Sequence, residues 1–203
     1  MFTNSSNAPA FLKVLLPVLL MLGCKAAVAA DEVPASQHVR FQTSEGDIVI
    51  ELDGRRAPLT VGHVLELIDN GYYNGTIFHR VIPGFMLQGG GYTRDLKEKD
   101  AGDETIPNES GNGLQNLRGT VAMARLPDPH SANAQFYINV VDNASLNPRP
   151  DRWGYTVFGY VIEGMDVADK IAATPTGPAG EFASDVPVAT VIIEKAARVD
   201  YSQ

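Results

Sequence analysis

The residues that most clearly suggest chemistry lie in one short stretch, FHRVIPGFMLQGGG, which runs from Phe78 to Gly91. Arg80 stands there among apolar residues, although a guanidinium stays charged at any ordinary pH. Gln88 is a second polar residue in the same stretch. An arginine in a strand is most often an edge residue whose charged end reaches water. The stretch is therefore a candidate site in which a permanent cation borders apolar side chains, and its chemistry depends on the residues around it.

Several familiar kinds of site find no support in the residue spacing. The glycines 89–91 are not followed by Gly-Lys-Ser/Thr, so a phosphate-binding loop is not predicted. Ser110 lies outside a G-x-S-x-G elbow, which argues against serine hydrolysis. Alternation along a strand turns His79 away from Arg80, and we predict a structural hydrogen-bonding role for it. No metal or cofactor is expected, because the histidines lack ligand spacing: His38, His63, His79 and His130.

The composition is that of an ordinary globular protein. The 203 residues suit one or two domains, with 44% hydrophobic and 20% charged residues. The formal net charge of −8 argues against nucleic acid or an anionic membrane surface as the main partner.

The first thirty residues have the pattern of a secretory signal peptide. Lys13 precedes an apolar run at 14–23, which is too short to span a bilayer but suits the hydrophobic region of a signal peptide. Small residues at 28–30 then precede Asp31, so we predict cleavage there and a periplasmic location. The alternative is a lipoprotein modified at Cys24, because MLGC loosely matches a lipobox.

The predicted cleavage also removes the only cysteine, Cys24. The mature chain would then have no thiol and no disulfide. Lys13 and Lys25 are lost with it and no acidic residue is, which leaves 14 basic and 24 acidic residues and a net charge of −10.

The rest of the chain combines short strands with irregular loops. Alternating apolar residues predict a hairpin at 38–43 and 47–52. A 3.6-residue period predicts one helix over TVGHVLELIDNG, capped by Thr60 and ended by Gly71, and another over GMDVADKIAAT. Further strands are predicted in TIFHRVI, FMLQGG, GTVAMA, AQFYINV, YTVFGYV and ATVIIEKAARV. Loops are predicted at 92–112, 125–133, 142–154 and 174–187. The pattern indicates a closed antiparallel barrel with helical caps.

Four of these stretches together resemble the cyclophilins, a family of peptidyl-prolyl cis-trans isomerases. They are FHRVIPGFMLQGGG, GTVAMAR, AQFYINV and FGYVIEGMDVADKI, in the family's order and spacing over residues 38–198. With the leader and the loop SLNPRPDRWGYTVFG, the likeness is greatest to periplasmic cyclophilins of Gram-negative bacteria. It implies a closed eight-stranded antiparallel barrel capped by two helices, with the active site on the outer surface of one sheet. We therefore expect a signal peptide at 1–30, a lead-in at 31–37 and the isomerase domain at 38–203.

The resemblance also implies roles for individual residues. Arg80 matches the catalytic donor to the prolyl nitrogen, and Gln88 matches the polar residue that orients this arginine and the substrate. The positions implied in substrate binding are Phe85, Met86, Ala124, Arg125, Tyr137, Leu146 and Tyr155. Ala124 and Arg125 match a segment whose backbone pairs with the substrate chain.

Four positions are informative departures from the family pattern. Tyr137 stands where the family usually has Phe, and Tyr155 where many eukaryotic members have His. Members that bind cyclosporin tightly have a tryptophan on the pocket rim, at the position of Ser145. We therefore expect weak cyclosporin binding. The alternative is that Trp153, which follows the insertion NPRPD, folds back to supply the missing ring.

Two functions remain open for such a chain. One is an isomerase acting on proline-containing, unfolded or partly folded exported proteins, and the other is a chaperone-like binding module on the same fold. The intact set of Arg80, Phe85, Met86 and Gln88 favours the enzyme. A monomer without nucleic-acid partners is expected.

Overall fold

Strands account for most of the regular structure in the computed structural model, which describes residues 1–3 and 35–201. They are β1 (Ser36–Thr43), β2 (Gly46–Asp53), β3 (Thr76–Ile82), β4 (Met86–Thr93), β5 (Thr120–Met123), β6 (Phe136–Asn139), β7 (Val157–Glu163), β8 (Thr176–Ala179), β9 (Phe182–Pro187) and β10 (Ile192–Val199). The helices are α1 (Pro58–Asp69) and α2 (Met165–Ala172), and η1 (Ala144–Leu146) is a 3-10 turn. The predicted cleavage site, the apolar run before it and Cys24 lie outside the described residues. In the part that is described, no helix has both the length and the apolar character needed to cross a bilayer.

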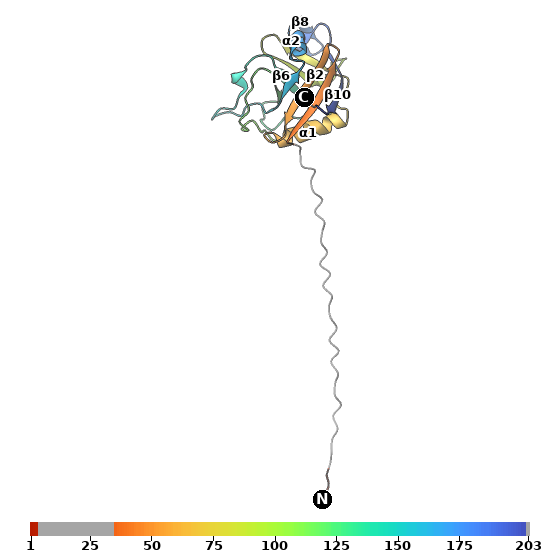
Figure 1. Ribbon diagram of the computed structural model, residues 1–203, viewed down its shortest axis with the longest axis vertical. Coiled ribbons are helices and arrows are strands. Elements are labelled where there is room, and N and C mark those ends of the chain that lie inside the picture. Colours follow the sequence, from red (N-terminus) through yellow and green to blue (C-terminus); the bar gives the residue numbers. More distant parts are fainter. Residues whose placement is uncertain (4–34, 202–203) are drawn as a thin grey trace. The chain divides into compact units, whose positions relative to one another are not determined.

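Eight of these strands close into one antiparallel barrel, in the order β1-β10-β3-β4-β6-β5-β7-β2. Figure 1 shows α1 and α2 toward opposite ends of this barrel. The predicted eight-stranded barrel with two helices is therefore confirmed. The predicted loop at 174–187 is wrong in part, because β8 and β9 form a separate two-stranded hairpin there. Its sequence, TGPAGEFASDVP, contains proline and glycine that weaken the alternating pattern of a strand.

Helix α1 begins two residues before the predicted cap. Pro58 occupies the first turn, where the missing proline N–H costs no hydrogen bond, and Ala57 is the capping residue. The end is as predicted, since Gly71 takes a left-handed φ of 67° just beyond the helix. Thr60 lies inside the helix and donates from its hydroxyl to Glu109, 2.6 Å away. The same carboxylate accepts the backbone N–H of Thr60, so a distant loop caps this helix.

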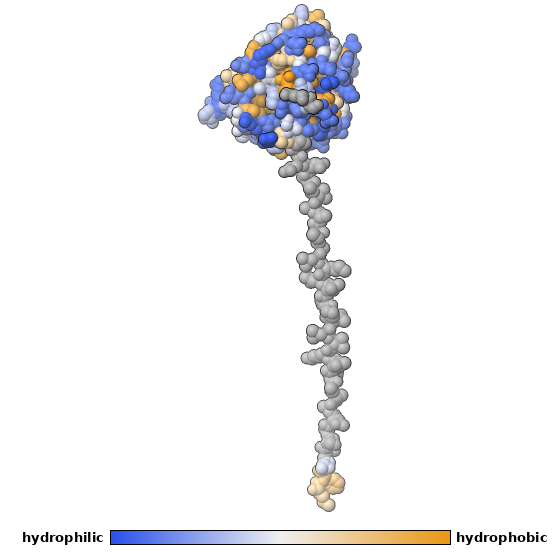
Figure 2. All heavy atoms as spheres, in the orientation of Figure 1, coloured by the Kyte–Doolittle hydropathy of each residue, from blue (hydrophilic) through white to orange (hydrophobic). Residues whose placement is uncertain are grey.

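The barrel interior holds the main hydrophobic core. Aromatic rings meet edge-on at its centre, with Phe136 5.5 Å from Tyr73 and 6.1 Å from Phe78, centroid to centroid. Edge-to-face contacts of this kind add to the free energy gained from burial. With these rings inside, the face visible in Figure 2 is mostly hydrophilic, with apolar residues in smaller areas between. The barrel lumen is therefore filled, and a site must lie on its outside.

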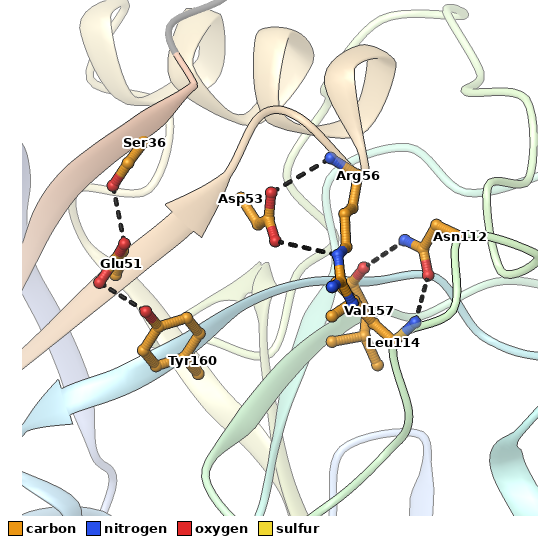
Figure 3. A network of polar contacts seen from close by, with 8 residues as sticks. All are labelled: Ser36, Glu51, Asp53, Arg56, Asn112, Leu114, Val157 and Tyr160. Carbon is orange, nitrogen blue, oxygen red and sulfur yellow. Dashed lines mark hydrogen bonds and ion pairs between the residues drawn. The ribbon is translucent and has the colours of Figure 1, made fainter.

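Polar contacts link the neighbouring barrel strands β1, β2 and β7, as Figure 3 shows. The Glu51 carboxylate on β2 accepts hydrogen bonds from Tyr160 on β7 at 2.6 Å and from Ser36 on β1 at 2.8 Å. The bond from Tyr160 is the main reason why the pKa of Glu51 is lowered, and it raises the pKa of Tyr160 to about 12. In the same view, Asn112 donates to the carbonyl of Val157 and accepts the N–H of Leu114, each at 2.9 Å. This second link fixes the backbone of Leu114 to strand β7.

Candidate active site

A β-bulge in strand β3 decides where Arg80 points. Phe78 pairs with Gly89 on β4 and Arg80 pairs with Gln88, so His79 is an extra residue on one side of the ladder. A bulge of this kind re-aims the side chains that follow it. Phe78 lies in the barrel core, whereas Arg80 lies outside that core beside its cross-strand partner Gln88. The strand is thereby able to anchor in the core and still present a cation on its outer face.

His79 occupies the bulge itself and has a packing role in place of the predicted hydrogen-bonding role. Its ring lies 4.6 Å from that of Tyr92 and 5.6 Å from that of Phe182, between centroids. Its Nδ1 is buried and has no hydrogen-bond partner among residues 1–3 and 35–201. Burial lowers the pKa of His79 to about 4. The neutral ring therefore links β3, β4 and the β8–β9 hairpin.

Polar side chains form a row on the outer face beside Arg80. Its Nη1 donates to Oε1 of Gln88 at 3.4 Å, and Nε2 of Gln88 donates to Oε1 of Gln135 at 2.9 Å. On the other side, Oδ2 of Asp185 lies 3.8 Å from Nε of Arg80. The guanidinium is thus held between an amide on β4 and a carboxylate on β9.

A small apolar cluster borders this row, separate from the barrel core. Its buried members are Met86, Ala122, Tyr137 and Val157, and its partly buried members are Ile82, Phe85, Leu114, Ala124, Leu146 and Tyr155. Ile82 pairs with Met86 across β3 and β4, two residues along each strand from Arg80 and Gln88. The cluster therefore continues on the face that carries the polar row. Six positions predicted for substrate binding meet here: Phe85, Met86, Ala124, Tyr137, Leu146 and Tyr155.

Tyr137 is a buried member of this cluster, and its hydroxyl forms a hydrogen bond within the protein. It donates to Oδ1 of Asn116 at 2.7 Å, and burial raises the pKa of Tyr137. Asn139 donates to the same oxygen, and Asn143 links Oδ1 of Asn139 at 2.7 Å to the carbonyl of Phe85 at 2.9 Å. A tyrosine in place of phenylalanine therefore leaves the pocket apolar, because its polar end joins a buried amide network.

Arg125, predicted to bind through its backbone, has its side chain engaged within the protein. The guanidinium donates to the carbonyls of Leu126 at 2.9 Å and Trp153 at 3.1 Å, and it lies 4.6 Å from the centre of the Tyr155 ring. Within the described part of the chain, the Arg125 N–H has no hydrogen-bond partner. The arginine side chain thus fixes the loop that carries Tyr155, while its backbone stays open to a bound chain.

Six residues of the arrangement were not predicted as site residues from the sequence: Ile82, Leu114, Ala122, Gln135, Val157 and Asp185. Gln135 had a local signal, because it stands two residues before Tyr137 in AQFYINV and so on the same face of that segment. Gln135 also explains why residue 91 is a glycine, because a Cβ at that position would come within 2.5 Å of the Gln135 side chain. Leu114 and Asp185 lie in a loop and in the unpredicted hairpin, where no periodic pattern marked them.

A solvent-open groove of about 650 Å³ continues from the polar row. Gln88, Ala124 and Gln135 line it next to the apolar cluster. Its charged lining residues are of both signs: Glu98, Lys99, Asp100, Asp103 and Arg125. No group of three or more His, Cys, Asp or Glu in residues 1–3 and 35–201 is arranged to hold a metal ion. The site thus combines a cation held by two neighbours, an apolar cluster and a groove with room for an extended chain.

Ser145, next to Leu146, has an exposed side chain in η1. Trp153 is an exposed residue, and its indole meets the His130 ring edge-on at 5.4 Å. The inserted loop is closed by Arg152, which donates to the Ser145 carbonyl.

Comparison with known proteins agrees with this arrangement. The family model of cyclophilin type peptidyl-prolyl cis-trans isomerases matches residues 38–198. Peptidyl-prolyl cis-trans isomerase A of Dickeya dadantii is 45% identical over 184 residues, which cover 91% of this chain and 96% of that protein. Peptidyl-prolyl cis-trans isomerase B of Escherichia coli is 54% identical over 159 residues, covering 77% of this chain and 96% of that protein.

A solved structure shows the same fold. The Cryptosporidium parvum cyclophilin type peptidyl-prolyl cis-trans isomerase, crystallised in the presence of the dipeptide ala-pro, superposes with a TM-score of 0.67 at 28% identity. The match covers 81% of this chain and 100% of that one. With its closed barrel, its outer-face site and these relatives, the chain belongs to the cyclophilin-type peptidyl-prolyl cis-trans isomerases.

Proposed function

We propose that Arg80 catalyses the isomerisation by donating a hydrogen bond to the prolyl nitrogen. The peptide bond is planar through resonance, with a rotation barrier of about 18–20 kcal/mol. As the bond twists, the nitrogen lone pair localises and becomes an acceptor. A guanidinium supplies permanent charge and rigid donors without an acceptor of its own. The observation that carries the proposal is the Arg80–Gln88 pair beside the apolar cluster of Met86 and its neighbours.

The hydrogen bond from Arg80 accounts for about half of the required barrier reduction at most. Uncatalysed isomerisation takes roughly 10–100 s. Acceleration to milliseconds requires about 10⁴-fold, or roughly 5.5 kcal/mol. One hydrogen bond to a charged group contributes only about 1.5–3 kcal/mol. The remainder is supplied by the apolar cluster, which holds the proline ring, and by donors fixed in advance for the twisted amide.

The proposed substrates are unfolded or partly folded exported proteins in the periplasm. The apolar run at 14–23, with small residues at 28–30 after it, supports export. The 650 Å³ groove beside Gln88 and Gln135 supports a polypeptide substrate, since it has room for a chain continuing from the proline pocket. We propose that the enzyme acts as a monomer, because one chain forms the polar row, the apolar cluster and the groove.

Arg80→Ala and Arg80→Lys test the catalytic role. We expect kcat/KM for a proline peptide to fall at least about tenfold in Arg80→Ala, and Arg80→Lys to be impaired because an ammonium does not reproduce the planar donors. Arg198→Ala is the matched control, because Arg198 is also a strand residue with a carboxylate partner, and both side chains are 41% exposed. Near-normal turnover by both Arg80 variants, with unchanged circular dichroism, would rule out the role.

A further inference from the structure

Among residues 1–3 and 35–201, Asp185 is the one carboxylate that forms an ion pair with Arg80. Its Oδ2 lies 3.8 Å from Nε of Arg80, while Nη1 of the arginine reaches Gln88 at 3.4 Å. The bond to Gln88 is near the long limit for a hydrogen bond, so by itself it restrains the guanidinium weakly. Contacts at Nε and at Nη1 together restrain both the position and the plane of the group. Among the described residues, this leaves Nη2 without a protein partner.

The backbone at Asp185 supports a dedicated role. Its φ of 68° lies in the left-handed region, which side chains other than glycine seldom adopt. Asp and Asn are the non-glycine residues that enter this region most readily, because their short side chains form local hydrogen bonds. A strained residue persists only where its surroundings hold it, and such residues are concentrated at functional sites.

Packing of the β8–β9 hairpin holds Asp185 in this conformation. Phe182, at the start of β9, packs edge-on against Tyr92 at 5.0 Å and contacts His79, the residue before Arg80. Val186, directly after Asp185, is buried and pairs with Gly177 on β8. The hairpin is thus anchored on both sides of Asp185, and the carboxylate between these anchors is directed at the guanidinium.

We propose that Asp185 is a positioning residue, which holds the Nε side of Arg80 so that a free donor faces the prolyl nitrogen. This inference rests on the proposed catalytic role of Arg80. The Asp185 side chain is 32% exposed and that of Arg80 41%. Because an exposed ion pair is weak, the expected loss on removing the carboxylate is moderate, about two- to fivefold in kcat. KM should stay the same, since the interaction with Arg80 acts in the transition state.

Two substitutions distinguish the effect of the Asp185 carboxylate from the effect of its backbone conformation. Asp185→Asn keeps the shape and the tolerance for positive φ, and Asp185→Gly takes positive φ without strain. Both remove the charge, so both should lower kcat about two- to fivefold while leaving KM unchanged. NMR relaxation of the Arg80 Nε–H should show greater mobility in both variants. Asp69→Asn is the control, because it removes the carboxylate partner of Arg198, a pair that belongs neither to the apolar cluster nor to the groove, and its kcat should match the wild type.

Measurements in the Arg80→Ala variant distinguish the positioning role of Asp185 from the catalytic role of Arg80. There, Asp185→Asn should have no further effect on kcat, because the residue that it positions is absent. A wild-type or raised kcat in Asp185→Asn, or an equal loss in the Arg80→Ala background, would overturn the positioning role while leaving Arg80 as the donor. If Arg80→Ala itself keeps full activity, the proposed catalytic role fails instead.

Discussion

Gln88 donates a 2.9 Å hydrogen bond to Gln135, a residue 47 positions further along the chain. The bond joins β4 to the segment leading into β6, and it lies between Arg80 and the groove. Gln88 can therefore present its carbonyl oxygen to Arg80, because Gln135 accepts from its amide nitrogen. Gly91 makes this possible, since any side chain there would collide with Gln135.

Gly91→Ala should therefore disturb the hydrogen bond between Gln88 and Gln135. A Cβ would lie 2.5 Å from the Gln135 side chain, which must move away from Gln88. We expect kcat/KM to fall about two- to tenfold, the equivalent of one neutral hydrogen bond of roughly 0.5–1.5 kcal/mol. Gly111→Ala is the matched control, because nothing lies within 4 Å of a Cβ at that position. Equal kcat/KM values for the two variants would contradict the role of Gln135.

The buried ring of His79 should make stability depend on pH. Its pKa is lowered from about 6.5 to about 4 by burial, so below pH 6.5 the unfolded chain binds a proton that the folded chain does not. The contribution of His79 to the free energy of unfolding is then fully present above pH 6.5. It falls by up to about 1.4 kcal/mol per pH unit toward pH 4. Urea unfolding at several pH values measures it. His79→Phe keeps a ring between Tyr92 and Phe182 and should lose less stability over this range; an identical pH dependence would exclude His79 as the cause.

Cyclosporin should bind weakly, at least about tenfold less tightly than to family members with a rim tryptophan, because a lost aromatic anchor costs about 2 kcal/mol or more. Ser145 is exposed beside Leu146, and Trp153 packs on His130. Titration of the inhibitor against Ser145→Trp should show a partial gain in affinity. Trp153→Ala serves as the comparison: tight binding by the wild type that is lost in this variant would show that Trp153 forms the rim.

Processing should produce a mature chain that begins at Asp31, or at Ala30 one residue earlier, and is found free in the periplasm. The small residues at 28–30 fit the recognition pattern of a signal peptidase. N-terminal sequencing and mass spectrometry of the exported protein measure this directly. Cys24→Ser should be processed identically, whereas a lipid-modified Cys24 in the wild type would establish the lipoprotein alternative.

The sequence alone was enough to predict the barrel. Alternation and helical periodicity are local properties, so the eight barrel strands and both helices could be recognised from short windows. Phe85, Met86, Tyr137 and Leu146 come from distant segments, and their grouping was predicted only through the resemblance of the motifs to a family. The hydrogen bonds that the Arg125 side chain makes to the carbonyls of Leu126 and Trp153 had no such signal.

Tertiary structure alone decided how Arg80 is presented and held. Simple alternation along β3 places Phe78 and Arg80 on one face, but the bulge at His79 puts Phe78 in the core and Arg80 outside. A bulge depends on the pairing with β4, which no single strand encodes. The approach of Asp185 depends likewise on the β8–β9 hairpin packing over His79. Side chains brought together by strand pairing and packing, rather than by spacing along the chain, therefore became visible only in three dimensions.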